Sequence, residues 1–161
     1  MKNALLLEKQ ALKQVMAPAD LAVAVTGARI GISKGDKIAI AIVMGASLAS
    51  TTAFTLKQHD AATAGNSKNL EVANPYFYKA GSATAFTKVS PTVAAAVYDL
   101  STIFSTAAGI VVFEVLSEQL DNENGYGYVS VDIGAAGAAK IGAGVYILDN
   151  VRHAPAYALD I

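Results

Sequence analysis

Hydrophobic and polar residues alternate with a period of two along most of the chain after residue 20. The clearest example is residues 37–44, KIAIAIVM, in which Ile38, Ile40 and Ile42 occupy every second position. Such alternation over short runs, bounded by Gly, Asp, Ser or Pro, is typical of strands with one buried face. The pattern predicts strands at residues 21–25, 28–33, 37–44, 53–58, 71–79, 85–90, 110–116, 126–133 and 145–151.

Residues 51–70 predict a β-hairpin around which the middle of the chain is organised. Phe54, Leu56 and Gln58 lie at alternate positions and therefore on one face of the first strand. The small residues of 61–67 form a loop, after which the chain returns as a second extended segment. With the extended segments that follow, residues 53–90 have the pattern of a meander.

Three segments depart from this alternation. Residues 117–125, the most acidic part of the chain, predict a helical turn followed by a loop. Residues 134–144, rich in Gly and Ala, predict an irregular loop. Residues 91–109 predict one or two short helices, because apolar residues are spaced by four, three, four and three. These apolar residues are Val93, Val97, Leu100, Phe104 and Ala107.

The first 19 residues are interpreted as an arm that precedes one β-rich domain over residues 20–161. An apolar helical face can be drawn through Ala4, Leu5, Ala11, Leu12 and Met16, and Pro18 ends any helix there. The arm is either a frayed terminus or a segment that becomes ordered against a neighbouring subunit. For the second case the candidate interface residues are Leu5, Leu6, Leu7, Leu12, Val15 and Met16.

The patterns together predict a mainly β fold: a β-sandwich or barrel-like body with one or two short helices and an extended N-terminal arm. The 161 residues suit a single domain with a sizeable core. Charged residues make up 16% of the chain, below the roughly 25% of an ordinary domain, and hydrophobic residues make up 53%. Either the core is large for the chain, or partners cover part of the surface.

Two apolar stretches were tested for membrane targeting. The short run at residues 5–7 is interrupted by Glu8 and Lys9, which argues against a secretory signal. Residues 38–56 carry no charge, but they contain several Ser and Thr residues and alternate with a period of two. Two strands joined by a turn fit this stretch better than a membrane span.

Residues that carry chemistry are few and scattered. The chain has no cysteine and only two histidines, His59 and His153, so no metal or cofactor is expected. The acidic residues of 121–125 lack the glutamate that completes a calcium loop. Lys140 is followed by Ile rather than Ser or Thr, which excludes a phosphate-binding P-loop, and no nucleophile elbow surrounds Ser47. The 12 basic residues, balanced by 13 acidic ones, form no stripe for nucleic acid. An enzyme is therefore not expected.

Five segments carry a resemblance to a known class of proteins. They are FTLKQHDAATAGNSKNLE at 54–71, NPYFYK at 74–79, AFTKV at 85–89, VVFEVLSEQLDNENGYGYVSVDI at 111–133 and RHAPAY at 152–157. In their order and pattern they resemble the small decoration, or cement, proteins of tailed-bacteriophage capsids. The resemblance implies a virion structural protein without an active site. It would bind the outside of the capsid and bridge adjacent major capsid subunits against DNA pressure.

The same resemblance implies a location on the capsid surface of the virion, and in the host cytoplasm during assembly. It also implies a homo-oligomer, with a trimer as the expected form. Two alternatives stay open: another phage structural subunit, of the tail tube or of head completion, and a β-barrel that binds a small ligand. Candidate pocket residues for the barrel are Tyr76, Phe77, Tyr78, Tyr126 and Tyr128, which can equally serve ordinary core or cross-strand packing.

Overall fold

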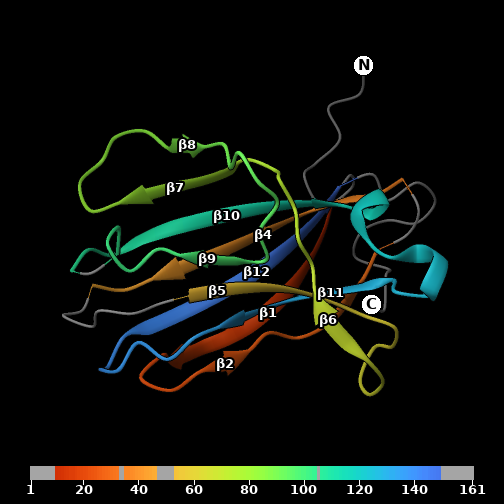
Figure 1. The fold of residues 1–161 in the computed structure, drawn as a ribbon. Coiled ribbons are helices and arrows are strands. Elements are labelled where there is room, and N and C mark those ends of the chain that lie inside the picture. The colour runs from red at the N-terminus through yellow and green to blue at the C-terminus, as the bar shows by residue number, and fades with distance from the viewer. Residues whose placement is uncertain (1–9, 33–34, 47–52, 105, 150–161) are drawn as a thin grey trace, which may run out of the picture.

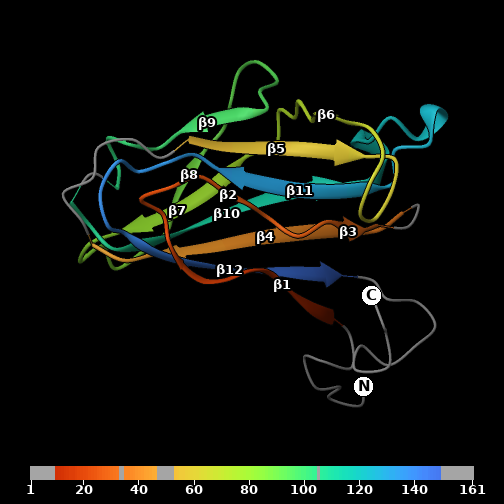
Figure 2. The ribbon, with the colours of Figure 1, turned by 90° about the horizontal axis from the view of Figure 1, so that it is seen from below.

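The computed structural model describes residues 10–32, 35–46, 53–104 and 106–149. These residues form two antiparallel six-stranded sheets that pack face to face as a sandwich (Figure 1, Figure 2). The mainly β class and the β-sandwich predicted from the sequence are confirmed. Among the described residues the helical elements are two 3-10 turns, η2 (Ser117–Gln119) and η3 (Asn122–Asn124), where the sequence predicted a helical turn.

Sheet A contains the longest strands, with β4 and β10 near its centre. Its strand order is β1 (Gln10–Asp20), β12 (Ile141–Asp149), β4 (Lys37–Met44), β10 (Gly109–Leu116), β7 (Tyr76–Ala80) and β8 (Thr87–Val89). All eight residues of β4 pair with β12 on one side and with β10 on the other. Apolar side chains at every second position of β4, as predicted from the sequence, point to one face of the strand, and this face is fully buried against sheet B.

Sheet B is built around β11 (Tyr128–Ile133) and β5 (Ala53–His59). The short strands β2 (Val25–Thr26) and β3 (Ile30–Gly31) pair with β11, and β6 (Ser67–Asn69) and β9 (Val97–Asp99) pair with β5. The predicted hairpin is therefore present as β5 and β6. The predicted meander is wrong, because β5 and β6 belong to sheet B whereas β7 and β8 belong to sheet A.

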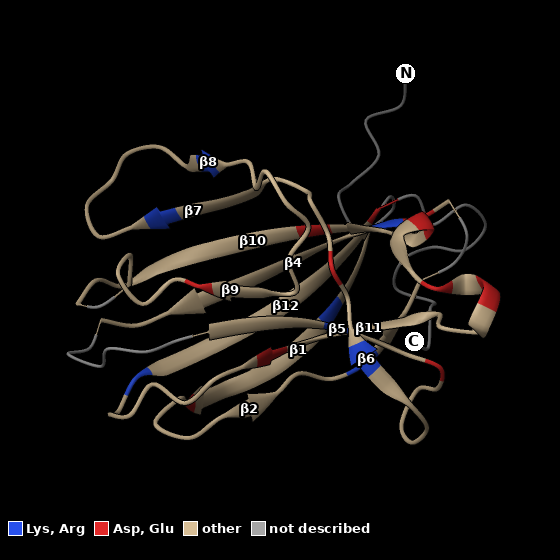
Figure 3. Ribbon diagram, in the orientation of Figure 1, with Lys and Arg blue, Asp and Glu red and all other residues tan. Residues whose placement is uncertain are grey.

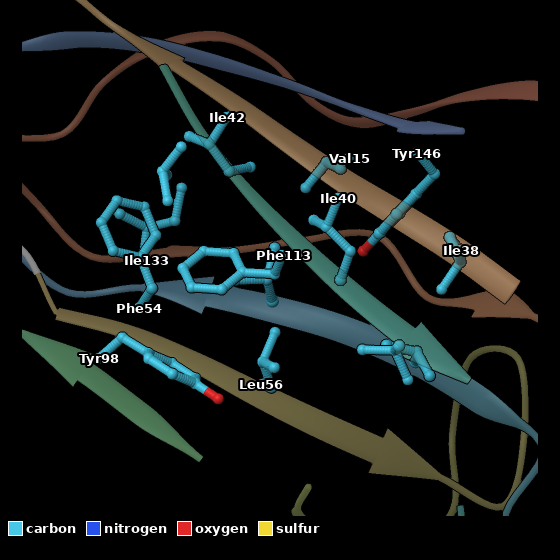
Figure 4. Close-up of a cluster of buried hydrophobic side chains, with 14 of the residues drawn as sticks. Val15, Ile38, Ile40, Ile42, Phe54, Leu56, Tyr98, Phe113, Ile133 and Tyr146 are labelled. Carbon is cyan, nitrogen blue, oxygen red and sulfur yellow. The ribbon is translucent and has the colours of Figure 1, made fainter. Parts of the chain in front are cut away.

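The inner faces of both sheets meet in one core (Figure 4). Phe113 of β10 lies at its centre, with ring centroids 5.8 Å from Phe54, 5.8 Å from Tyr76 and 5.0 Å from Tyr98. These four rings come from both sheets, so they join the two layers. Full burial of each such side chain contributes about 1.5–3 kcal/mol.

The helices predicted over residues 91–109 are not formed, because this segment contains β9 and turns. Val93 and Val97 are 74% and 51% exposed, whereas Leu100 and Phe104 are each 1% exposed, so the supposed apolar face is not buried as one surface. The hydroxyl of Tyr98 donates to the backbone oxygens of Val72 and Ala95, at 3.2 and 3.0 Å, which fixes extended backbone here. After β9 the side chain of Asp99 accepts a hydrogen bond from the backbone of Ser101, at 2.9 Å, in a turn.

The loop predicted over residues 134–144 is wrong at its C-terminal end, because β12 already begins at Ile141. A Cβ atom added to Gly142 would lie 2.7 Å from a methyl group of Leu21. A Cβ atom on Gly144 would lie 2.5 Å from a methyl group of Ile42. These two glycines therefore belong to a strand. Neighbouring side chains fill the space that a Cβ atom at either position would need.

The N-terminal prediction is wrong for its second half. Residues 10–19 do not form a helical face but belong to β1, which pairs with β12 along its length. From Gln10 onward the segment is thus part of the sandwich rather than a separate arm. Residues 1–9 lie outside the described part of the chain.

Candidate interaction surfaces

The solvent-facing side of sheet A is largely apolar. We call it the outer face; it consists of the outward side chains of β1, β12, β4 and β10. Burial alternates along these strands, so the residues between the core positions point outward. Each of the strands β4, β10 and β12 carries a single charged residue, and Figure 3 shows how sparse charge is along this part of the sheet. The outer face is thus a candidate surface for a protein partner.

Several apolar residues of the outer face are substantially exposed. The exposed fractions are 50% for Leu12, 53% for Val43, 43% for Val145 and 58% for Ile141. Ala41 is two residues from Val43 on β4 and is paired with Val145 of β12 and with Val112 of β10. Because neighbouring strands contribute to it, the apolar surface is continuous rather than a set of isolated residues.

An ion pair lies at the end of the outer face that is formed by the start of β4 and the end of β12. Lys37 Nζ is 2.9 Å from Asp149 Oδ2, and hydrogen bonding to this carboxylate raises the pKa of Lys37. Beside this ion pair is an open depression of about 280 Å³, whose lining includes Ala39, Ile147 and Glu114. An apolar floor with charges of both signs at its edge suits contact with protein side chains.

The predicted interface residues separate into three groups. Leu5, Leu6 and Leu7 lie outside the described residues. Leu12 is exposed and belongs to the outer face, where it pairs with Ile147.

Val15 and Met16, by contrast, are 1% and 7% exposed and belong to the core, so neither can contact a partner in this fold. A register irregularity of β1 between Gln14 and Met16 allows two successive side chains to be buried.

The other outer-face residues were not among those predicted from the sequence. A signal was present in residues 37–44, because Ala39, Ala41 and Val43 fill the positions between the isoleucines. A strand with one solvated face normally has polar residues at those positions. A nearly continuous apolar run in an antiparallel sheet therefore indicates that both faces of β4 are apolar.

A second exposed surface with little charge is formed by residues 81–97, which lead from β7 in sheet A to β9 in sheet B and contain Ser and Thr beside apolar residues. Most of this segment is exposed, including Phe86 at 50% and Val93 at 74%. Lys88 is its single charged residue. The segment is anchored by the pairing of β8 with β7 and by a bridge between Val72 and Ala95. It therefore presents apolar side chains on fixed backbone.

His59 ends β5 and is buried between two serines. Its Nδ1 lies 2.6 Å from Ser67 Oγ and its Nε2 lies 2.8 Å from Ser130 Oγ. Arg29 also approaches Ser67, at 3.2 Å, and donates to the backbone oxygen of Ala61 at 2.9 Å. The group holds the β5–β6 loop against β11. It contains two hydroxyls and no carboxylate bonded to the imidazole, so it has the features of a structural network rather than a catalytic triad.

We expect the folded protein to lose stability as pH falls below about 6.5, the ordinary pKa of histidine. Burial, followed by the charge of Arg29, lowers the pKa of His59. The unfolded chain therefore binds a proton at higher pH than the folded chain does. The contribution of His59 is complete above the unfolded pKa and is lost as pH falls toward the folded pKa.

Urea unfolding at pH 7.5 and pH 5 measures this change. His59→Asn should reduce the difference between the two pH values. An unchanged pH dependence in His59→Asn would show that other groups cause the loss.

Other polar clusters among the described residues also serve the fold. Asp121 binds the ammonium of Lys68 and accepts hydrogen bonds from Asn124, and these contacts lower the pKa of its carboxyl. The buried Lys140 ammonium donates to the backbone oxygen of Phe104, and burial lowers its pKa. Within the described residues no group of three or more His, Asp or Glu side chains is placed to hold a metal ion.

The five aromatic residues considered for a ligand pocket do not converge. Tyr76 and Tyr78 pack inward, Tyr76 against Tyr98 and Tyr78 against Phe104. Phe77 lies between these two tyrosines on β7, so its side chain points to the opposite face of the sheet, and it pairs with Val112 of β10.

The other two tyrosines lie in a different part of the molecule. Lys68 Nζ is 4.3 Å from the centre of the Tyr126 ring, and Tyr128 covers Gly31. Packing accounts for the five aromatic residues without a ligand.

Comparisons with known proteins give no match: no protein-family model, no curated protein and no solved structure is similar to this chain. In the part of the chain that the structure describes, no helix has the length and hydrophobicity needed to span a bilayer. The inference about function therefore depends on the surfaces described above and on the sequence resemblance.

Proposed function

We propose that this protein is a non-enzymatic virion structural protein that binds the outside of a tailed-phage capsid. There it stabilises the capsid by bridging adjacent major capsid subunits. The observation that carries the proposal is the presence of two separate exposed surfaces with little charge on one sandwich: the largely apolar outer face and residues 81–97. A bridging protein must make at least two contacts at once, and weak contacts repeated around a capsid reinforce one another.

Residues 81–97 are the better candidate for the capsid contact. Their backbone connects the two sheets, and their exposed side chains are small or apolar apart from Lys88. The segment also includes AFTKV, one of the stretches that resemble capsid decoration proteins. The proposed partner is the major capsid protein, and the protein acts as a homo-oligomer on the capsid surface.

Placing a charge in this segment is expected to weaken capsid binding. Val93→Lys should raise the dissociation constant at least about tenfold, equivalent to about 1.4 kcal/mol, because the ammonium must be desolvated in an apolar contact. Co-sedimentation with expanded empty capsids of the encoding phage measures binding. The capsid rupture temperature measures stabilisation.

Val23→Lys is the matched control, since Val23 is 67% exposed but lies outside both surfaces. The control should bind and stabilise capsids as the unmodified chain does. Assembly of the purified protein into tubes, together with failure to bind capsids, would favour a tail-tube subunit and contradict the proposal.

A further inference from the structure

The outer face of sheet A has a regular pattern of large and small side chains. Along the two adjacent strands β4 and β12, three consecutive outward rows each combine one large residue with one alanine. The pairs are Ile147 with Ala39, Val145 with Ala41, and Val43 with Ala143. A solvated sheet face gains nothing from such an arrangement, whereas a packed interface needs it, because packed side chains must interlock.

From this pattern we propose that the outer face is a two-fold interface with a second copy of this chain. A two-fold axis between the copies, parallel to the strands and midway between β4 and β12, exchanges the two strands. Val145 of one copy then faces Ala41 of the other, and Val43 faces Ala143. Each large side chain meets a small one across sheets about 10 Å apart, the ordinary distance of sheet packing.

The ion pair at the end of the face obeys the same symmetry. Lys37 and Asp149 are neighbours on β4 and β12, so the exchange places Lys37 of each copy opposite Asp149 of the other. No like charges face each other on these two strands. Glu114 lies one strand further out, on β10. Since packed sheets cross at about 30°, this flank diverges from the second copy and stays hydrated.

The size of the face suits a reversible dimer. With about 4.8 Å between strands and about 6.8 Å between successive outward residues, the outer face covers on the order of 600 Å². A standard interface buries about 800 Å² of each partner, so the contact, which leaves the β10 flank of the face hydrated, is smaller than a standard interface. Dimer formation should therefore depend on protein concentration. The inference goes beyond the proposed function, because it holds whether or not the protein binds capsids.

Sedimentation velocity of the full chain, from micromolar to hundred-micromolar concentration, tests the proposal. The expected result is a reversible monomer–dimer equilibrium. Val43→Glu should weaken dimerisation more than tenfold, because its carboxylate would be buried against Ala143 of the other copy. Val93→Glu makes the same chemical change on the exposed segment 81–97 and should leave the equilibrium unchanged. Circular dichroism and thermal unfolding show that each variant is folded.

A mixing experiment tests the two-fold register itself. Ala143→Lys alone should also weaken dimerisation. An equimolar mixture of Val43→Glu and Ala143→Lys should recover a heterodimer. In it the carboxylate introduced at position 43 of one chain faces the ammonium introduced at position 143 of the other, while the symmetry-related contact keeps Val43 and Ala143. A mixture that remains monomeric would overturn this register.

The remaining outcomes decide between the occupants of the face. A wild-type chain that is monomeric throughout, or a trimer insensitive to Val43→Glu, would overturn the inference. If the chain is monomeric and Val43→Glu abolishes capsid binding, the capsid covers this face: the dimer is refuted and the proposed function stands. If the dimer forms but capsids are ignored, the proposed function fails and the dimer stands.

Discussion

Replacing Phe113 with alanine is expected to lower the free energy of unfolding by about 4 kcal/mol. The side chain is 2% exposed and contacts aromatic rings from both layers of the sandwich. Removing the ring forfeits its burial and leaves a cavity between the sheets. It also removes aromatic contacts with Phe54, Tyr76 and Tyr98, which add about 0.5–1.5 kcal/mol per pair.

Urea denaturation followed by far-UV circular dichroism measures this loss, since the chain has no tryptophan to report unfolding by fluorescence. Phe86→Ala is the matched control: the same atoms are removed from a ring that is 50% exposed. The control should lose about 1 kcal/mol, because only about half of the Phe86 side chain is buried in the folded state. Equal losses in the two variants would show that the rings around Phe113 do not form the centre of the core.

Sequence alone predicted those elements whose pattern is local. Residues 37–44 and 53–59 form strands in which every second side chain is buried, and the alternation of Ile38, Ile40 and Ile42 shows this directly. The hairpin of β5 and β6 was predictable for the same reason, with small residues between the strands. In these regions local preference and tertiary packing favour the same structure.

Elements that depend on distant partners were missed. Gly142 and Gly144 lie in a Gly-rich and Ala-rich segment that resembles a loop. A strand contains them because Leu21 and Ile42, which are distant in the sequence, leave no room for a side chain at these two positions. Val93 fits a helical spacing, yet it lies in a bend, and a bridge between the nearby Ala95 and the distant Val72 holds the segment in place. Spacing along a chain does not reveal which neighbours a segment will have.

The candidate surfaces show the same limit. The sequence left open whether the core is large or partners cover part of the surface, and it placed the candidate contact residues in the N-terminal segment. In the fold, Val15 faces the core while Leu12 faces solvent, because β1 pairs with β12. The sequence signal at residues 37–44 concerns β4 alone, and the register with β12 shows that Ala39, Ala41 and Val43 belong to a larger apolar face. Its large and small residues are about 100 positions apart in the sequence.

Replacing Gly109 with alanine is expected to cost about 3 kcal/mol, at the upper end of the ordinary cost of overpacking. Gly109 begins β10 and pairs with Met44 on one side and Ala80 on the other. An added Cβ would lie 2.3 Å from the backbone oxygen of Lys79 and 2.5 Å from the ring of Phe104. Backbone in the middle of a sheet cannot move aside without breaking its own ladder, so the strain remains in the folded state.

Gly127→Ala separates this steric cost from the general effect of replacing glycine. No atom lies within 4 Å of the Cβ position at Gly127, and both replacements reduce the freedom of the unfolded chain equally. Gly127→Ala should therefore change the free energy of unfolding by less than about 1 kcal/mol, in either direction. An equal fall of the urea midpoint in both variants would contradict the steric explanation, in which β7 and Phe104 lie too close to Gly109 for a Cβ atom. A fall confined to Gly109→Ala supports that approach, in which the start of β10 meets both β7 and the turn that carries Phe104.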